Sequence, residues 1–291
     1  MTKAISAHEI SPELEQKNQH LRAILRGFAR VIIAYSGGVD SAFLLKVAHQ
    51  ELEIRAVGII GVSPSLMPEE HDAAVELASQ IGANLRVVET HEMDDENYAS
   101  NPNNRCYFCK SHLFETLTKI ARDENFDAVC DGTNLDDMNE WRPGALAGTE
   151  KQIRSPLREV NLTKNEIRQL SRVLDLPTWD KPAMPCLSSR IPYGTPVTIE
   201  ALRMIGRGEA FLRSQGLREV RVRHFDESGK LTARIEVAPE EIERAFALRE
   251  ELIRVLKEQG YNSILLDLEG YRRGKMNDAI ATQPLIQIAV K

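Results

Sequence analysis

Two cysteines stand three residues apart in the stretch RCYFCK, as Cys106 and Cys109, in a chain of 291 residues that has four cysteines. A pair with this spacing can hold a metal, form a redox-active pair, or have no joint role. Cys130 lies inside an apolar run and is expected to be a small buried side chain. Cys186 follows a proline in the proline-rich stretch KPAMPCLSSRIPYG. Which of these thiols does chemistry depends on the groups around them.

A second candidate site is the stretch AYSGGVDS, which lies between an expected strand and an expected helix. Its glycines allow a tight turn that brings backbone N–H groups close to an anion, and the helix N-terminus adds about half a positive charge. The sequence has neither the GxxxxGK[ST] nor the GxGxxG spacing. The stretch therefore indicates either an ordinary glycine-rich turn or a phosphate site of another kind, with these candidate residues: Ser36, Gly37, Gly38, Asp40 and Ser41.

Two further polar stretches follow expected strands. GVSPS contains Gly61 and Ser63, and DGTNLDD contains Gly132 and Asn134. Because the carboxyl ends of parallel strands meet at one edge of the sheet, we expect both to lie near the glycine-rich turn. For DGTNLDD the alternative is a turn rich in Asp and Asn without a ligand.

Alternation in EVRVRHF points Arg221 and Arg223 to one face of a strand. Two neighbouring guanidinium groups repel each other unless an anion or a carboxylate lies between them, and arginine suits bidentate phosphate contacts. The site is therefore either an anion site or a solvated strand face, and Glu236 on the next expected strand is a possible partner.

The elements that position these residues alternate in the first half of the chain. We expect strands at 30–38, 55–63, 84–91 and 126–134, and helices at 11–28, 40–52, 67–82 and 111–125. Strands that are apolar throughout, separated by helices, predict an α/β domain with a doubly wound parallel sheet. Ligands of such sheets bind at the carboxyl ends of the strands.

The second half predicts a smaller α+β domain after a proline-rich segment. Its expected elements are a helix at 198–216, strands at 218–225 and 231–237, a long helix at 239–260 and a strand at 262–270. We place the two domains at 1–183 and 184–291.

Composition is that of a globular protein, with 42% hydrophobic and 27% charged residues. The formal net charge of −6 argues against a partner held mainly by phosphate contacts, and leaves a local basic patch as an alternative. The stretch MTKAISAHEISPELEQKN lacks an apolar core of the length that a signal peptide needs, and no later run of ~18 apolar residues could span a membrane. We expect a cytoplasmic protein, whose cysteines are free, metal-bound or catalytic.

SGGVDS resembles the pyrophosphate loop of the ATP pyrophosphatase superfamily, which includes GMP synthetase, NAD synthetase, asparagine synthetase and tRNA thiolation enzymes. The resemblance implies an adenine nucleotide alpha hydrolase-like fold and cleavage of ATP between the α and β phosphates, with adenylation of the substrate. It implies that Asp40 is the Mg²⁺ ligand. GVSPS would then contact the adenine, and DGTNLDD would close over the nucleotide.

The stretches KPAMPCLSSRIPYG, EVRVRH and LDLEGYRRGKMN, with the pyrophosphate loop, resemble the LarE family over residues from about 15 to about 280. The resemblance implies adenylation of a carboxylate of pyridinium-3,5-biscarboxylic acid mononucleotide and its conversion to a thiocarboxylate, for the nickel-pincer nucleotide cofactor of lactate racemase. It assigns the following roles: Cys186 as sulfur donor, Ser189, Arg221 and Arg223 to the substrate phosphate, and Glu209 as an acidic residue near the site. Asp267 is a separate acidic candidate, and Arg190 is expected to favour the Cys186 thiolate.

RCYFCK departs from the single-cysteine members of this family, which consume one cysteine per turnover. Other members have three, and in the present chain Cys106, Cys109 and Cys186 would suit a [4Fe–4S] cluster with one open iron that carries sulfide. In that scheme Cys186 is a ligand and survives. Zinc, a redox pair and chance remain alternatives.

Three other functions are weighed against this interpretation. A tRNA thiolation enzyme would need a basic surface, a nucleotide sensor would bind ATP without releasing pyrophosphate, and an amidotransferase-type ligase would need a glutaminase domain. The LarE resemblance also implies a homo-oligomer, a hexamer, that acts on a small-molecule nucleotide substrate with ATP and Mg²⁺.

Overall fold

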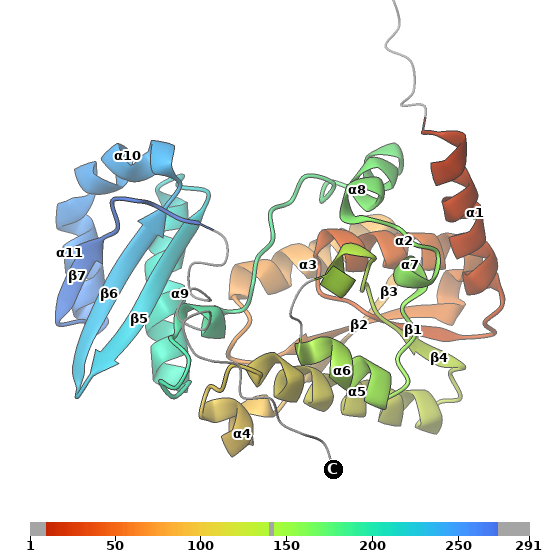
Figure 1. Ribbon diagram of the computed structural model, residues 1–291, viewed down its shortest axis with the longest axis horizontal. Helices are drawn as coiled ribbons and strands as arrows, with labels where there is room; N and C mark the ends of the chain where they lie inside the picture. The colour runs from red at the N-terminus through yellow and green to blue at the C-terminus, as the bar shows by residue number, and fades with distance from the viewer. Residues whose placement is uncertain (1–9, 140–142, 273–291) are drawn as a thin grey trace, which may run out of the picture. The chain divides into compact units, whose positions relative to one another are not determined.

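The computed structural model describes residues 10–139 and 143–272 (Figure 1). The chain divides into two compact units: the first holds the residues up to Glu92 together with Asn104–Met184, and the second holds Met93–Asn103 together with the residues from Pro185. A short segment from the first half of the sequence therefore folds with the second unit. The end of the LDLEGYRRGKMN stretch, from residue 273, lies outside the described residues.

The first unit is built on a parallel sheet with the strand order β3-β2-β1-β4. Its strands are β1 Val31–Ala34, β2 Ala56–Val62, β3 Asn84–Glu89 and β4 Ala128–Cys130. Its helices are α1 Pro12–Arg26, α2 Val39–Leu52, α3 Pro68–Ile81, α5 Arg105–Asp123, α6 Pro143–Glu150, α7 Pro156–Glu159 and α8 Lys164–Val173. The strand order reverses between β1 and β4, which is where open α/β sheets bind ligands.

Both faces of this sheet are covered, as Figure 1 shows. Ile33 of β1 packs in a core with α1, α2, α3 and α8, while its neighbour Ile32 packs in a second core with α5 and α6. Both side chains are fully buried. The apolar strands of the sequence follow from this double burial, and the predicted doubly wound α/β domain is confirmed.

The second unit contains a three-stranded sheet with the order β5-β6-β7. Strands β5 Val220–Glu227 and β6 Lys230–Val237 form an antiparallel hairpin, and β7 Ser263–Leu266 is parallel to β6. The helices are α4 Glu96–Ala99, α9 Ile199–Ser214, α10 Ile242–Ala247 and α11 Arg249–Glu258. This mixed sheet confirms the expected second, smaller domain.

Two predicted helix boundaries are wrong. The helix expected from residue 111 begins at Arg105, because no residue that breaks a helix separates RCYFCK from the amphipathic run after it. The helix expected at 239–260 is interrupted at Leu248, whose N–H donates to the carbonyls of both Arg244 and Ala245 and so tightens the last turn of α10. The first of these differences puts both cysteines of RCYFCK in the first turns of α5.

The segment Met93–Asn103 is tied to the loop that follows Cys186 by side-chain hydrogen bonds. The Asn101 amide is fully buried and donates to the carbonyls of Pro192 and Thr195, each at 2.8 Å. The Tyr98 hydroxyl lies 2.7 Å from the Ser188 hydroxyl. We call this set of contacts the clasp.

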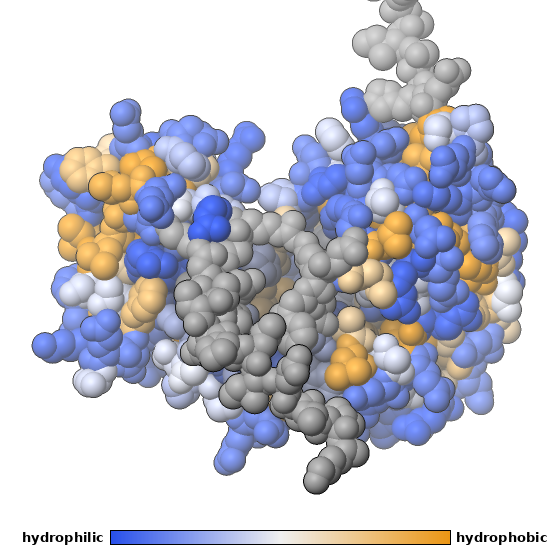
Figure 2. Space-filling model, viewed as in Figure 1, coloured by the Kyte–Doolittle hydropathy of each residue, from blue (hydrophilic) through white to orange (hydrophobic). Residues whose placement is uncertain are grey.

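The surface of the second unit carries apolar side chains around α10, α11 and β7 (Figure 2). The large exposed ones in this area are Phe246, Ile253, Leu265 and Leu268. We call these four side chains the apolar patch. Within the described residues, no helix is long and apolar enough to cross a membrane.

Candidate active site

The glycine-rich turn after β1 is shaped by close packing. Gly37 has a φ of +69°, and a Cβ at this position would lie 2.5 Å from the Cβ of Ala74 in α3, so only glycine fits. The Ser41 hydroxyl accepts the Ser36 N–H at 3.1 Å and closes the turn. Gly38 is the N-cap of α2 and supplies no capping side chain. No side chain of the described residues caps the N–H groups of the first turn of α2, an arrangement that fits an anion site at a helix N-terminus.

The loop after β4 lies directly against this turn. A Cβ on Gly132 would lie 2.9 Å from the backbone N of Ser41 and 3.2 Å from the Cβ of Asp40. Asn134 is buried, and its side-chain oxygen accepts the Asp136 N–H at 2.9 Å. The sequence-predicted residues Ser36, Gly37, Gly38, Asp40, Ser41 and Gly132 therefore come together, whereas the side chain of Asn134 shapes its own loop.

Asp40 presents one satisfied and one unsatisfied oxygen. Its Oδ2 accepts the Lys164 ammonium at 2.5 Å, while its Oδ1 is buried and has no hydrogen-bond partner among the residues that the structure describes. A buried carboxylate oxygen without a partner costs free energy unless a ligand meets it. Mg²⁺ takes oxygen ligands beside substrate phosphates, so this atom fits the ion. The sequence analysis did not identify Lys164 as a site residue. The pattern next to it, the capping box of Thr163 and Glu166, predicts the start of α8 but not a contact with Asp40.

Gly61 and Ser63 occupy the end of β2. A Cβ on Gly61 would lie 2.9 Å from a methyl of Leu113 in α5, which gives this glycine a packing role. The Ser63 hydroxyl lies 2.9 Å from that of Ser65, whose hydroxyl donates to Glu92 at 3.4 Å. The contacts of these residues lie within the protein, so their assignment to adenine stays a prediction.

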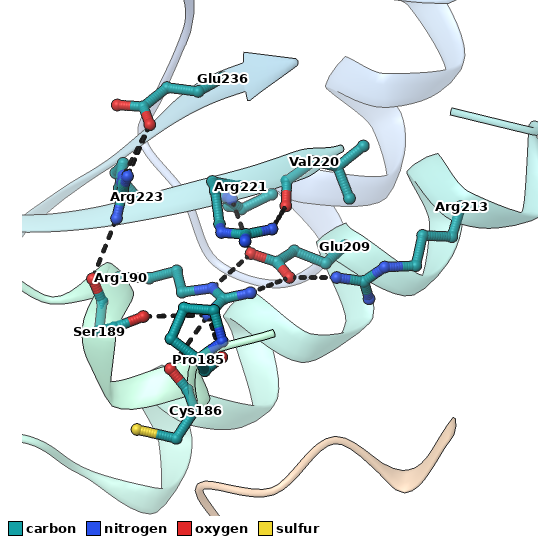
Figure 3. Close-up of polar contacts among 11 residues, drawn as sticks. Pro185, Cys186, Ser189, Arg190, Glu209, Arg213, Val220, Arg221, Arg223 and Glu236 are labelled. Carbon is teal, nitrogen blue, oxygen red and sulfur yellow. Dashed lines mark hydrogen bonds and ion pairs between the residues drawn. The ribbon is translucent and has the colours of Figure 1, made fainter. Parts of the chain in front are cut away.

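In the second unit, a buried ion pair lies behind the Cys186 loop (Figure 3). Arg190 and Glu209 are both 0% exposed. The Arg190 Nε and Nη2 donate to the two oxygens of Glu209 at 2.7 and 2.8 Å. Glu209 also accepts the Arg213 guanidinium at 2.6 Å and the N–H of Val222 at 3.1 Å. Burial alone raises the pKa of Glu209, but the hydrogen bonds and charges of the arginines outweigh it and hold the pKa below its usual range.

The two arginines of EVRVRHF have different partners. Arg223 is paired with Glu236 at 2.7 Å and donates to the backbone carbonyl of Ser189 at 3.0 Å. Arg221 is 3% exposed, lies over the Tyr271 ring at 4.6 Å and donates to the carbonyl of Val220, but within the described part of the chain no carboxylate pairs with it. Burial and the charge of Arg190 lower the pKa of Arg221, while the nearby charge of Glu209 opposes this shift. Among the described residues, Arg221 is thus a buried cation that forms no ion pair.

Cys186 is half-buried, and its backbone carbonyl accepts the Arg190 Nη1 at 3.0 Å. In Figure 3 its sulfur points away from that guanidinium. The hydrogen bonds of Arg190 therefore go to Glu209 and to the loop, and the expectation that its charge favours the Cys186 thiolate stays a prediction.

Asp267 is held by structural contacts. Its carboxylate accepts the Glu269 N–H at 3.0 Å and lies 3.6 Å from the Arg234 guanidinium, which also pairs with Glu236. These contacts place it at the end of β7, and its assignment to the active site stays a prediction.

The remaining cysteines differ in accessibility. Cys106 is exposed and Cys109 half-buried, one helical turn apart in α5. Cys130 is fully buried in β4, where burial raises the pKa of its thiol, so it is inert. Within the described ranges, no group of three or more His, Cys, Asp or Glu residues is arranged to hold a metal ion. The first unit thus offers two accessible thiols that fit part of a thiolate ligand set.

No family model matches the chain. Among curated proteins, an uncharacterised protein of Synechocystis is 47% identical over 91% of this chain and 98% of its own length. A pyridinium-3,5-bisthiocarboxylic acid mononucleotide synthase of Lactiplantibacillus plantarum is 34% identical over 95% of this chain and 99% of its own length. One of the subunits of the glutamine-hydrolysing GMP synthase of Archaeoglobus fulgidus is 26% identical over 61% of this chain and 58% of its own length.

The second of these relatives matches the chain from end to end, through both units, while the GMP synthase subunit matches only part of it. The near-complete match, on a chain that also has the glycine-rich turn and the paired arginines, establishes that the protein belongs to the LarE family of ATP-dependent sulfur transferases.

Proposed function

We propose that the protein adenylates a carboxylate of pyridinium-3,5-biscarboxylic acid mononucleotide and replaces it with a thiocarboxylate. The observation that carries the proposal is Arg221, a buried guanidinium that forms no ion pair among the described residues and lies in the same unit as the Cys186 loop. Such a guanidinium suits a phosphate monoester. Arg223 holds the backbone of Ser189, three residues from Cys186, so the phosphate site and the thiol share one loop. The L. plantarum relative is a synthase of the corresponding bisthiocarboxylic acid mononucleotide, which supports this substrate.

In the first unit, the N–H groups at the start of α2 bind the phosphates of ATP, with Ser36, Gly37, Gly38 and Ser41 forming the turn. Asp40 would hold Mg²⁺ through Oδ1, and the ion would neutralise phosphate charge. The substrate carboxylate attacks the α-phosphorus, the bond to the β-phosphate oxygen breaks, and pyrophosphate leaves. Gly61, Ser63, Gly132 and Asn134 surround the nucleoside side of this site in the proposal.

In the second unit, Ser189, Arg221 and Arg223 hold the substrate phosphate, and Glu209 lies behind them. If Cys186 is the sulfur donor, its thiolate attacks the acyl adenylate and AMP leaves, so that a thioester joins enzyme and substrate. Loss of the Cys186 α-proton then breaks the Cβ–S bond. The products are the thiocarboxylate and a dehydroalanine at position 186, and Cys186 is consumed.

We favour the alternative in which Cys106, Cys109 and Cys186 hold a [4Fe–4S] cluster, which supplies sulfide when bound. Two accessible thiols one turn apart in α5 support it.

The proposal includes a cytoplasmic homo-oligomer, a hexamer, with no membrane or nucleic acid partner. The apolar patch of α10, α11 and β7 supports an oligomer, since patches of this kind mark contacts between proteins.

The test is anaerobic purification with iron and sulfide analysis, followed by turnover with ATP and the mononucleotide. We expect pyrophosphate release that depends on the mononucleotide, cluster iron, and an intact Cys186 in the protein mass after turnover. A protein lighter by one H₂S, without iron, would establish the consumed-cysteine route instead. Thiolation that survives Cys186→Ala would refute both routes, and Cys130→Ala is the matched control that should leave thiolation unchanged.

A further inference from the structure

The guanidinium of Arg190 uses its hydrogen-bond donors on two sides. On one side Nε and Nη2 donate to Glu209, and on the other Nη1 lies 2.5 Å from the Pro185 carbonyl and 3.0 Å from both the Cys186 carbonyl and the Ser189 hydroxyl. Figure 3 shows this guanidinium between α9 and the loop. Three oxygens of the loop therefore converge on one nitrogen.

Stability does not explain this arrangement. A buried ion pair contributes little compared with an apolar pair of the same size, because both charges lose their hydration. Arg190 and Glu209 are both 0% exposed, so the cost is incurred in full. The effect of the pair is to fix positions. Glu209 holds the planar guanidinium of Arg190 in one orientation, and the guanidinium in turn holds the backbone carbonyls of the loop.

The same contacts determine the direction in which Ser189 can donate. Its backbone carbonyl accepts from Arg223 and its hydroxyl oxygen accepts from Arg190. A hydroxyl that accepts from a guanidinium retains its own hydrogen for donation. Ser189 can then donate to an anion, while the sulfur of Cys186 points away from the guanidinium (Figure 3).

We infer that Arg190, fixed by Glu209, is a positioning residue that sets the direction of the Cys186 thiol and of the Ser189 hydroxyl. The inference rests on the proposed function, in which Cys186 either is a cluster ligand or attacks the activated carboxyl, and Ser189 meets the substrate phosphate. Arg190 touches neither reactant and acts through the loop backbone.

Arg190→Lys tests this inference, because lysine keeps the charge but cannot hold Glu209 and three loop oxygens at once. We expect sulfur transfer at saturating substrate to fall at least tenfold while pyrophosphate release changes less than twofold. Alkylation of Cys186 by iodoacetamide, followed by peptide mass spectrometry, should become at least threefold faster because the loop is released. Arg213→Lys is the matched control, since Arg213 donates to the same carboxylate, and it should change each rate less than threefold.

Alkylation is measured on iron-free protein. Far-UV circular dichroism reports on unfolding of either unit, and Cys130, fully buried in β4, reports on the first unit. Alkylation that rises at Cys186 while Cys130 stays protected and the circular dichroism is unchanged supports positioning. The positioning role of Arg190 would be refuted if Arg190→Lys changed neither Cys186 alkylation nor sulfur transfer. It would also be refuted if both rates fell in parallel, because that result indicates a direct effect on the thiol. If Arg190→Lys exposes Cys130, the variant is unfolded and the same measurements are made on Glu209→Asp, with the same criteria.

The alkylation measurement needs no substrate and therefore separates this inference from the proposed function. If the wild-type protein does not thiolate the mononucleotide, the proposed function fails, while the effect of Arg190→Lys on Cys186 alkylation still decides whether Arg190 holds the loop.

Discussion

The two units build their polar sites in opposite ways. In the first unit the turn after β1 uses backbone N–H groups and glycines, and its carboxylate Asp40 keeps an unsatisfied oxygen. In the second unit the site consists of buried charged side chains, in which Arg190 and Glu209 satisfy each other and Arg221 is the exception. A backbone cradle keeps its shape without ligand, whereas a network of buried charges keeps its shape only while each charge has its partner.

Removing Glu209 should have the largest effect. Glu209→Ala leaves Arg190 and Arg213 without their common anion, and breaking a buried pair in this way costs about 3–5 kcal/mol. Chemical denaturation followed by circular dichroism measures the loss. The matched control is Glu159→Ala, which removes the partner of the half-exposed Arg154 and should cost less than about 1 kcal/mol. Equal losses of unfolding free energy in Glu209→Ala and Glu159→Ala would show that the buried charges of the second unit matter no more for stability than an exposed pair in the first.

Removing the charge of Asp40 should affect catalysis and leave the fold. Asp40→Asn removes the expected Mg²⁺ ligand, and we expect pyrophosphate release to fall about 10²–10³-fold, as for loss of one preorganised electrostatic group. Its contact with the partly exposed Lys164 is worth less than about 1 kcal/mol, so the free energy of unfolding should barely change. Rates of pyrophosphate release and denaturation curves, measured on the same preparation, test both expectations. A large loss of stability would show that Asp40 belongs to a structural network as Glu209 does.

The two arginines of β5 should separate binding from stability. Arg221→Ala removes a cation without a protein anion, so mononucleotide affinity should fall about 10–100-fold, corresponding to the 1.5–3 kcal/mol of a charged hydrogen bond, while ATP affinity stays the same. Arg223→Ala removes a partner of the buried Glu236 and should lower stability as well. Calorimetric titration with each nucleotide and a denaturation curve distinguish the two. Equal loss of both affinities in Arg221→Ala would remove Arg221 from the phosphate site.

The smallest effect concerns pH. Burial lowers the pKa of His224, which lies 3.1 Å from the Tyr261 hydroxyl, so the folded state binds fewer protons than the unfolded state. Stability is then present above the ordinary value of 6.5 and is lost as the pH falls below it, by at most about 1.4 kcal/mol per pH unit. Denaturation at pH 7.5 and 5.5 measures this slope, which His224→Phe should reduce. A slope that persists in the variant would assign it to other groups.

The sequence predicted the first site better than the second for a physical reason. The turn after β1 depends on neighbours along the chain, so SGGVDS contains nearly all of its determinants, and the alternating elements defined the sheet that presents it. Arg190 contacts Glu209 across 19 residues and Asn101 contacts Thr195 across 94, and no local pattern specifies such pairs. The hydrogen bonds of Arg190 to Glu209 could not be predicted, because proximity in sequence to Cys186 does not fix where a long side chain points. Lys164 was missed because its contact with Asp40 spans 124 residues.

The clasp also has a consequence for biosynthesis. Asn101 leaves the ribosome well before Thr195, and at about 5–20 residues per second the 94 residues between them take roughly 5–20 s to make. Until then the buried amide of Asn101 lacks the carbonyls of Pro192 and Thr195, although β1, β2 and β3 of the first unit have already been synthesised. Completion of the second unit is thus necessarily late in translation, and a fragment that begins at Pro185 would be made without the residues that close its Cys186 loop.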